Sequence, residues 1–98
     1  MAKEVRWTDE AITTFNNIIG YIQAEWSEKA VREFIQKTDE VVTHVAVYPY
    51  MFKKYNKHSI RQALITKQTL LLYKIYTTHI DLVAFWDTRQ NPRRKKMA

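Results

Sequence analysis

The sequence contains no cysteine, one glycine and two prolines among 98 residues. Without cysteine there is no disulfide framework and no thiolate metal site, which fits a reducing, cytoplasmic setting. So little glycine and proline argues against a long disordered linker and against a turn-rich β-sandwich. The N-terminus lacks an apolar signal region, and no apolar run is long enough to span a membrane. We therefore expect a single cytoplasmic domain over residues 1–98 with one modest core, no membrane segment, and residues 90–98 as a basic tail.

The usual motifs of catalysis and cofactor binding are also missing. The three histidines are scattered, and His58 and His79 have no cysteine or carboxylate at the spacing of metal ligands. There is no glycine-rich loop to hold a phosphate and no recognisable activated nucleophile. We expect no metal and no cofactor.

Charge is distributed unevenly along the chain. Residues 1–52 carry 5 Lys/Arg and 8 Asp/Glu, whereas residues 53–98 carry 11 Lys/Arg and only two acidic residues, Asp81 and Asp87, so the halves balance at −3 and +9. A basic C-terminal half indicates an acidic partner, either nucleic acid or an acidic protein surface. The cations expected to meet a target or partner are Lys53, Lys54, Lys57, Arg93, Arg94, Lys95 and Lys96.

The first half of the chain predicts a short strand and two helices. Residues 3–7 alternate as a strand, and apolar residues then recur at three- and four-residue steps up to Trp26. Thr8 or Asp9 is the expected N-cap of this helix, and Ser27 that of a second helix that ends before Pro49. Because almost nothing separates the two helices, we expect an antiparallel helix hairpin.

The second half has the two-residue period of strands. Residues 59–65, 70–76 and 80–86 predict three strands, and their short connections require antiparallel neighbours. The expected fold is α+β: an N-terminal strand and a two-helix hairpin packed on an antiparallel sheet of about four strands. Asp87 is expected to brace the turn that follows the last strand.

The last two strands are apolar on both faces. Leu71, Tyr73 and Ile75 point one way and Leu70, Leu72 and Tyr76 point the other. The helix hairpin can cover one face, so an apolar surface for a partner, with Leu70, Leu72 and Tyr76 as the candidates, is one interpretation. A curled sheet that covers itself is the other. A similar choice exists in the preceding loop, where Tyr50, Phe52 and Tyr55 either stack on bases or anchor the loop in the core.

The whole order resembles the RelE/ParE superfamily of bacterial toxins. The resemblance covers nearly the full chain and is carried by "RWTDEAITTFNNIIGYIQAEWSEKAVREFIQK", "LLYKIY" and "IDLVAFWDTRQNP". It implies a toxin of a type II toxin–antitoxin system, of the kind called plasmid stabilisation proteins. It also implies a cognate antitoxin with an acidic segment that folds across the toxin.

Two activities occur in this superfamily. RelE-like members cut mRNA on the ribosome with basic residues of the sheet and a C-terminal Tyr or His, and ParE-like members inhibit DNA gyrase. The resemblance places Arg61 and Arg89 at basic positions of the nuclease set, so these are the catalytic candidates if the chain is an endonuclease.

The sequence departs from the nuclease pattern at three places. Ala63 stands where the nucleases tend to have a base, Leu70 stands where they usually have Arg, and no Tyr or His follows Arg89. Two guanidinium groups do not easily supply both a base and an acid, because they stay protonated. The ParE-like branch is therefore favoured. An mRNA endonuclease and a family member with little toxicity remain the alternatives.

Overall fold

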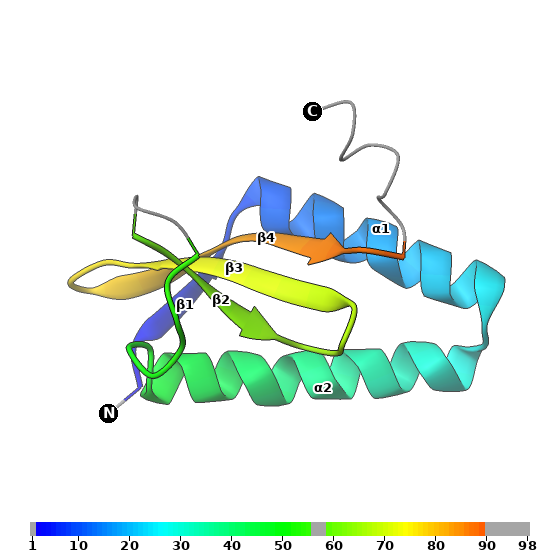
Figure 1. Ribbon diagram of the computed structural model, residues 1–98, viewed down its shortest axis with the longest axis horizontal. Coiled ribbons are helices and arrows are strands. Elements are labelled where there is room, and N and C mark those ends of the chain that lie inside the picture. Colours follow the sequence, from blue (N-terminus) through cyan, green and yellow to red (C-terminus); the bar gives the residue numbers. More distant parts are fainter. Residues whose placement is uncertain (1, 56–58, 90–98) are drawn as a thin grey trace.

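The computed structural model describes residues 2–55 and 59–89. The elements are β1 (Glu4–Trp7), α1 (Asp9–Glu25), α2 (Glu28–Val47), β2 (Ile60–Leu64), β3 (Thr69–Ile75) and β4 (His79–Asp87), shown in Figure 1. The α+β class and the order of strand, helix hairpin and three strands are confirmed.

The helices begin where the predicted caps stand. The Thr8 hydroxyl accepts a hydrogen bond from the Ala11 amide, and the Ser27 hydroxyl accepts one from the Ala30 amide. Each cap satisfies an amide that has no partner inside its helix, which fixes where the helix starts. Two residues, Trp26 and Ser27, separate the helices, so the helices run antiparallel. Helix α1 lies beside β4, and α2 lies beside β2 (Figure 1).

The sheet has the strand order β1-β4-β3-β2. The pairs β2–β3 and β3–β4 are antiparallel, as their short connections require. The pair β1–β4 is parallel, with Val5 opposite Ile80, so the described sheet is mixed rather than wholly antiparallel as expected. The difference arises because no tight turn links β1 to β4; the helix hairpin and two strands lie between them in the chain.

Where β1 ends, the N-terminal end of α1 lies along the edge of β4. The β3–β4 register shifts between Leu72 and Tyr73, and β1 pairs no further than Leu82. There the Thr8 hydroxyl donates to the Leu82 carbonyl, and the Thr14 hydroxyl accepts from the Phe85 amide. The Leu82 carbonyl also accepts from the Thr8 amide, and the Thr14 hydroxyl satisfies the Phe85 amide on the edge of β4 beyond the end of β1.

The core lies between the helices and one face of the sheet, called here the inner face. Its sheet residues include Leu71, Tyr73, Ile80 and Leu82, each fully buried, and Phe34 of α2 packs with them. Burying each such side chain stabilises the fold by about 1.5–3 kcal/mol relative to exposure. The alternation predicted for β3 is confirmed, since Leu71 and Tyr73 lie in this core and Leu70 and Leu72 do not.

Candidate functional site

The opposite side of the sheet, called here the outer face, carries an apolar patch of five residues. Leu64, Leu70 and Trp86 stand opposite one another across β2, β3 and β4, and Leu72 and Ala84 form the neighbouring pair. Leu64 is 61% exposed, whereas Leu70, Leu72, Ala84 and Trp86 are half-buried. The strands cover part of their own outer face and leave the β2 side open. Leu64 and Trp86 were missed as candidates, although the four-residue connection between β2 and β3 signals that Leu64 faces Leu70.

A groove of about 590 Å³ runs from this patch to the loop before β2. It is lined by Met51, Phe52, Lys53, Gln62, Leu64 and Leu70. The structure thus brings two predicted binding residues, Lys53 and Leu70, to one depression. Its apolar floor and cationic rim suit a partner segment with both apolar and acidic side chains.

The free edge of β2 is only partly covered beside this groove. The Gln62 amide donates to the Lys53 carbonyl at 3.1 Å, and the Tyr55 amide donates to the Ile60 carbonyl at 2.5 Å. Leu64 is the next residue on that edge, and no backbone group of residues 2–55 or 59–89 pairs with it there. An extended peptide is therefore able to add to the sheet at Leu64.

Tyr76 lies at the other end of β3, away from the apolar patch. Its ring stacks on the His79 ring with centroids 4.7 Å apart, and Lys74 Nζ lies 5.2 Å from the centroid of the same tyrosine. His79 Nε2 lies 3.4 Å from Asp81 Oδ1. This corner of the outer face is polar, so Tyr76 does not share a surface with Leu70 and Leu72.

Arg61 points to the inner side of the sheet and holds the loop before β2. It stands opposite Tyr73, its Nη1 donates to the Phe52 carbonyl at 2.6 Å, and its guanidinium carbon lies 5.2 Å from the Tyr50 ring centroid. The Tyr73 hydroxyl donates to the Pro49 carbonyl at 2.7 Å, and burial raises the pKa of Tyr73 to about 12. Arg61 and Tyr73 therefore tie the loop to the sheet by two buried or half-buried contacts.

The aromatic residues of this loop were expected either to anchor it in the core or to stack on a partner, and the structure divides them between these two positions. Phe52 packs against the core and meets the Tyr73 ring edge-on, which makes it an anchor. Tyr50 and Tyr55 are 68% and 50% exposed, so their rings are accessible to a partner. Lys54 pairs with Arg61 through an isolated β-bridge and lines a small depression with Tyr50.

Arg89 is bound by a buried carboxylate just after β4. Asp87 is fully buried; its Oδ2 accepts from Arg89 Nη2 at 2.7 Å and from the Thr69 hydroxyl at 2.5 Å, and its Oδ1 accepts from Arg89 Nε and the Arg89 amide. Burial alone raises the pKa of the Asp87 carboxyl, but the hydrogen bonds from Arg89 and Thr69 outweigh it and hold the pKa below its usual value. The predicted bracing role of Asp87 is confirmed.

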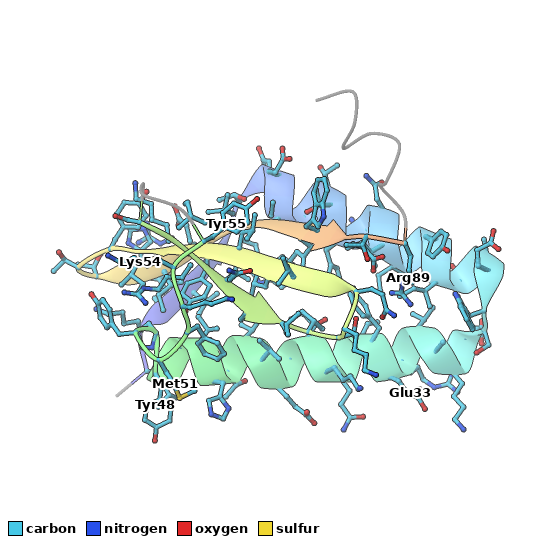
Figure 2. The ribbon with its side chains drawn as sticks, viewed as in Figure 1. Glu33, Tyr48, Met51, Lys54, Tyr55 and Arg89 are labelled. Carbon is cyan, nitrogen blue, oxygen red and sulfur yellow. The ribbon has the colours of Figure 1, made fainter. Side chains whose placement is uncertain are left out.

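The sheet keeps the two candidate arginines apart. Arg61 stands opposite Tyr73, whereas Asp87, which holds Arg89, stands opposite Thr69. Four residues of strand separate these positions, which is about 13 Å of sheet. Figure 2 shows Lys54, whose bridge partner is Arg61, at one end of the sheet and Arg89 at the other.

Lys57, Arg93, Arg94, Lys95 and Lys96 lie outside the described residues. Within residues 2–55 and 59–89, no group of three His, Cys, Asp or Glu gathers as a metal site would require. In the same residues, no helix combines the length and the apolar character needed to cross a bilayer.

The fold leaves an apolar surface open at the β2 edge, and comparison with known proteins gives the family. The profile of the ParE toxin of type II toxin–antitoxin systems, parDE, matches residues 5–92. The chain therefore belongs to the ParE toxin family. A search of curated protein sequences returns no match.

Solved structures share the fold at low sequence identity. A chain of the chromosomal ParDE system from P. aeruginosa superposes with a TM-score of 0.74 at 11% identity, covering 88% of this chain and 96% of that one. The toxin–antitoxin complex RelBE2 from Mycobacterium tuberculosis gives 0.59 at 20% identity, covering 89% and 99%. The YoeB dimer from Staphylococcus aureus gives 0.63 at 13% identity, covering 88% and 97%. Toxins of both the ParDE and RelBE kinds thus share this architecture.

Proposed function

We propose that this toxin acts by inhibiting DNA gyrase, as a ParE-like protein of the cytoplasm, and that a cognate antitoxin neutralises it. The observation that carries the proposal is the separation of Arg61 from Arg89, each of which binds a group of its own chain. Arg61 holds the Phe52 carbonyl and Arg89 holds the Asp87 carboxylate. A toxin without an assembled catalytic set acts by binding its target.

The chemistry of RNA cleavage supports this choice. Cleavage needs one group that takes the 2′-hydroxyl proton and another that protonates the leaving oxygen. The described residues that line the Arg61 depression with it are Tyr50, Lys54, Ser59 and Ile75, which include no carboxylate and no imidazole. Tyr73, the nearest tyrosine across the strand, is buried with a pKa of about 12 and already donates to Pro49. Arg61 therefore has no carboxylate or imidazole in its depression to carry a proton at neutral pH.

The outer face and its groove support the antitoxin part of the proposal. An acidic, partly unfolded antitoxin segment would place apolar side chains on Leu64, Leu70 and Trp86 and add its backbone to the open edge of β2. Lys53 at the rim of the groove would meet its carboxylates. The antitoxin would then contact both apolar and basic residues of the second half of the chain.

Induction of the toxin in bacterial cells, followed by primer extension on abundant mRNAs, tests the mode of action. We expect mRNA 5′ ends to be unchanged while growth stops, because no catalytic set is assembled. New ends phased with codons would contradict the proposal and support a ribosome-dependent endonuclease that uses Arg61 and Arg89. Continued growth with intact mRNA would also contradict it and would indicate a family member with little toxicity.

A further inference from the structure

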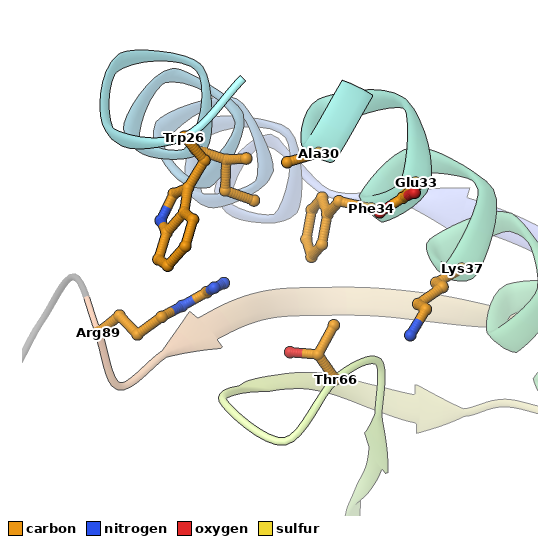
Figure 3. A pocket seen from close by; sticks show the side chains of 8 residues that line it. Trp26, Ala30, Glu33, Phe34, Lys37, Thr66 and Arg89 are labelled. Carbon is orange, nitrogen blue, oxygen red and sulfur yellow. The ribbon is translucent and has the colours of Figure 1, made fainter. Parts of the chain in front are cut away.

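A second pocket, separate from the outer-face groove, opens between the helix hairpin and the end of β4. Its volume is about 190 Å³, and Figure 3 shows the side chains that line it. The lining residues are Ile22, Trp26, Ala30, Glu33, Phe34, Lys37, Thr66 and Arg89. Ile22, Ala30 and Phe34 give it an apolar wall, and Trp26, 65% exposed, forms one rim. The volume is smaller than the roughly 300–1,000 Å³ of small-molecule sites, so it suits a single side chain.

The cation in this pocket is held in place before any ligand arrives. Asp87 binds Nε and Nη2 of Arg89, and the buried Asp87 is itself fixed by Thr69. Within the described residues, no acceptor binds Arg89 Nη1. Figure 3 shows the guanidinium extending below the Trp26 ring toward Phe34, with Lys37 on the far side of Thr66. A guanidinium held on one edge presents its remaining N–H groups to a second acceptor at little entropic cost.

The charged residues of the pocket lie at different sides of it. Arg89 stands at the Trp26 side, and Lys37 adds a second positive charge across Thr66. Glu33 is on the α2 wall, away from Arg89 in Figure 3. A carboxylate that enters beside Trp26 therefore meets Arg89 first, and an apolar neighbour of that carboxylate meets Ile22, Ala30 and Phe34.

We infer that this pocket binds an acidic peptide segment of the antitoxin, with one apolar side chain inside and an adjacent carboxylate on Arg89 Nη1. The inference rests on the antitoxin-dependent function proposed above. A peptide fits better than a nucleic acid, because the wall of Ile22, Ala30 and Phe34 offers no side-chain hydrogen-bonding group to a base edge. Arg89 thereby becomes a binding residue, and Asp87 a positioning residue that acts through it.

The test is a titration of the ¹⁵N-labelled full chain with two capped tetrapeptides, acetyl-Ala-Leu-Glu-Ala-amide and its Gln analogue. We expect the Glu peptide to shift the Trp26 indole and Arg89 Nε–H signals and to bind about fivefold more tightly than the Gln peptide. The indole signals of Trp7 and Trp86, which do not line the pocket, should not move. Equal affinity for the two peptides, or a response at Trp86 in place of Trp26, would overturn the inference. A larger Trp26 response to a thymidine hexanucleotide than to the peptide would overturn it too.

Two variants and a control make the test specific. Arg89→Gln should remove the preference for Glu over Gln. Because that change leaves Asp87 buried without its cation, Ala30→Leu provides a second test: it keeps Arg89 and fills the pocket, and should weaken both peptides at least fivefold. Arg32→Gln, an exposed α2 residue outside the lining, should change neither affinity. Unaltered peptide binding by folded Ala30→Leu would overturn the inference.

The inference and the proposed function fail in different ways. The peptide titration needs no gyrase, so a wild-type chain that binds the Glu peptide and leaves gyrase unaffected retains the pocket and loses the proposed target. A wild-type chain that inhibits gyrase and binds both peptides equally retains the target and loses the pocket.

Discussion

The two faces of the sheet are built from the same strands and from similar residues, yet they differ in burial. On β3, Leu71 is fully buried under the helix hairpin, whereas Leu72, the next residue, is half-buried on the outer face. The hairpin covers one face, and this short chain leaves the other to its own cross-strand contacts. Similar apolar residues therefore stabilise the fold on the inner face and remain accessible to a partner at the β2 edge of the outer face.

The largest effect should come from truncating neighbouring leucines of β3. Leu71→Ala removes a fully buried side chain and should lower the free energy of unfolding by about 3 kcal/mol, because it loses burial and leaves a cavity. Leu72→Ala is the matched control and should cost about 1 kcal/mol. Urea unfolding measures both. Equal losses would remove the contrast between the faces.

The next largest effect should come from Asp87, the buried carboxylate at the end of β4. Asp87→Asn removes the charge that binds Arg89 and should cost about 2 kcal/mol at pH 7. Because the folded pKa of Asp87 lies below the ordinary value of 3.8, its stabilisation is present above that value and is lost as the pH falls through the folded pKa.

The pH dependence of the stability tests the role of Asp87 separately from the loss measured at pH 7. The variant should lose less stability than the wild type as the pH falls below 3.8, in thermal unfolding followed by circular dichroism. Asp39→Asn, on the exposed face of α2 and in no ion pair among the described residues, is the control with the same change of charge and is measured in parallel. An acid profile of Asp87→Asn equal to the wild type would show that Asp87 is not the group responsible.

A smaller effect distinguishes a structural Arg61 from a catalytic one. Arg61→Ala removes the hydrogen bond to Phe52 and should cost about 1.5 kcal/mol. It should also speed tryptic cleavage at Lys53 and Lys54, because the loop loses the hydrogen bond between Arg61 and the Phe52 carbonyl. Arg6→Ala, at an exposed arginine of β1, should leave the rate of cleavage at Lys53 and Lys54 unchanged. If Arg61→Ala abolished toxicity while stability and cleavage stayed at wild-type levels, Arg61 would be an active-site group.

The smallest effect on stability should come from the exposed edge. Leu64→Ser should change the free energy of unfolding by no more than about 0.5 kcal/mol, since the side chain is 61% exposed. It should weaken binding of the antitoxin, the expected acidic product of the neighbouring reading frame, about tenfold, or about 1.4 kcal/mol. Calorimetry measures the affinity, with Ile12→Ser on exposed α1 as the control. Unchanged affinity for Leu64→Ser would place the antitoxin elsewhere.

Local signals in the sequence predicted most of the fold. The caps at Thr8 and Ser27, both helices and the three C-terminal strands follow from side-chain periodicity and from hydrogen bonds within a few residues. The parallel direction of β1 was not predictable in this way, because it depends on where the helix hairpin returns the chain.

The candidate site was less predictable, for a related reason. The position of Arg61 on a strand was clear, but its bond to the Phe52 carbonyl depends on the path of the preceding loop. The grouping of Leu64, Leu70 and Trp86 depends on the register of three strands. The pocket at Arg89 combines two helices, a turn and a strand end, and no local pattern brings these together.

The most direct test of the proposed action is a supercoiling assay with purified DNA gyrase, relaxed plasmid and increasing amounts of the purified toxin. The account predicts that supercoiling falls as the toxin concentration rises and that the folded Arg61→Lys variant inhibits as well as the wild type. Full supercoiling at saturating wild-type toxin would contradict it.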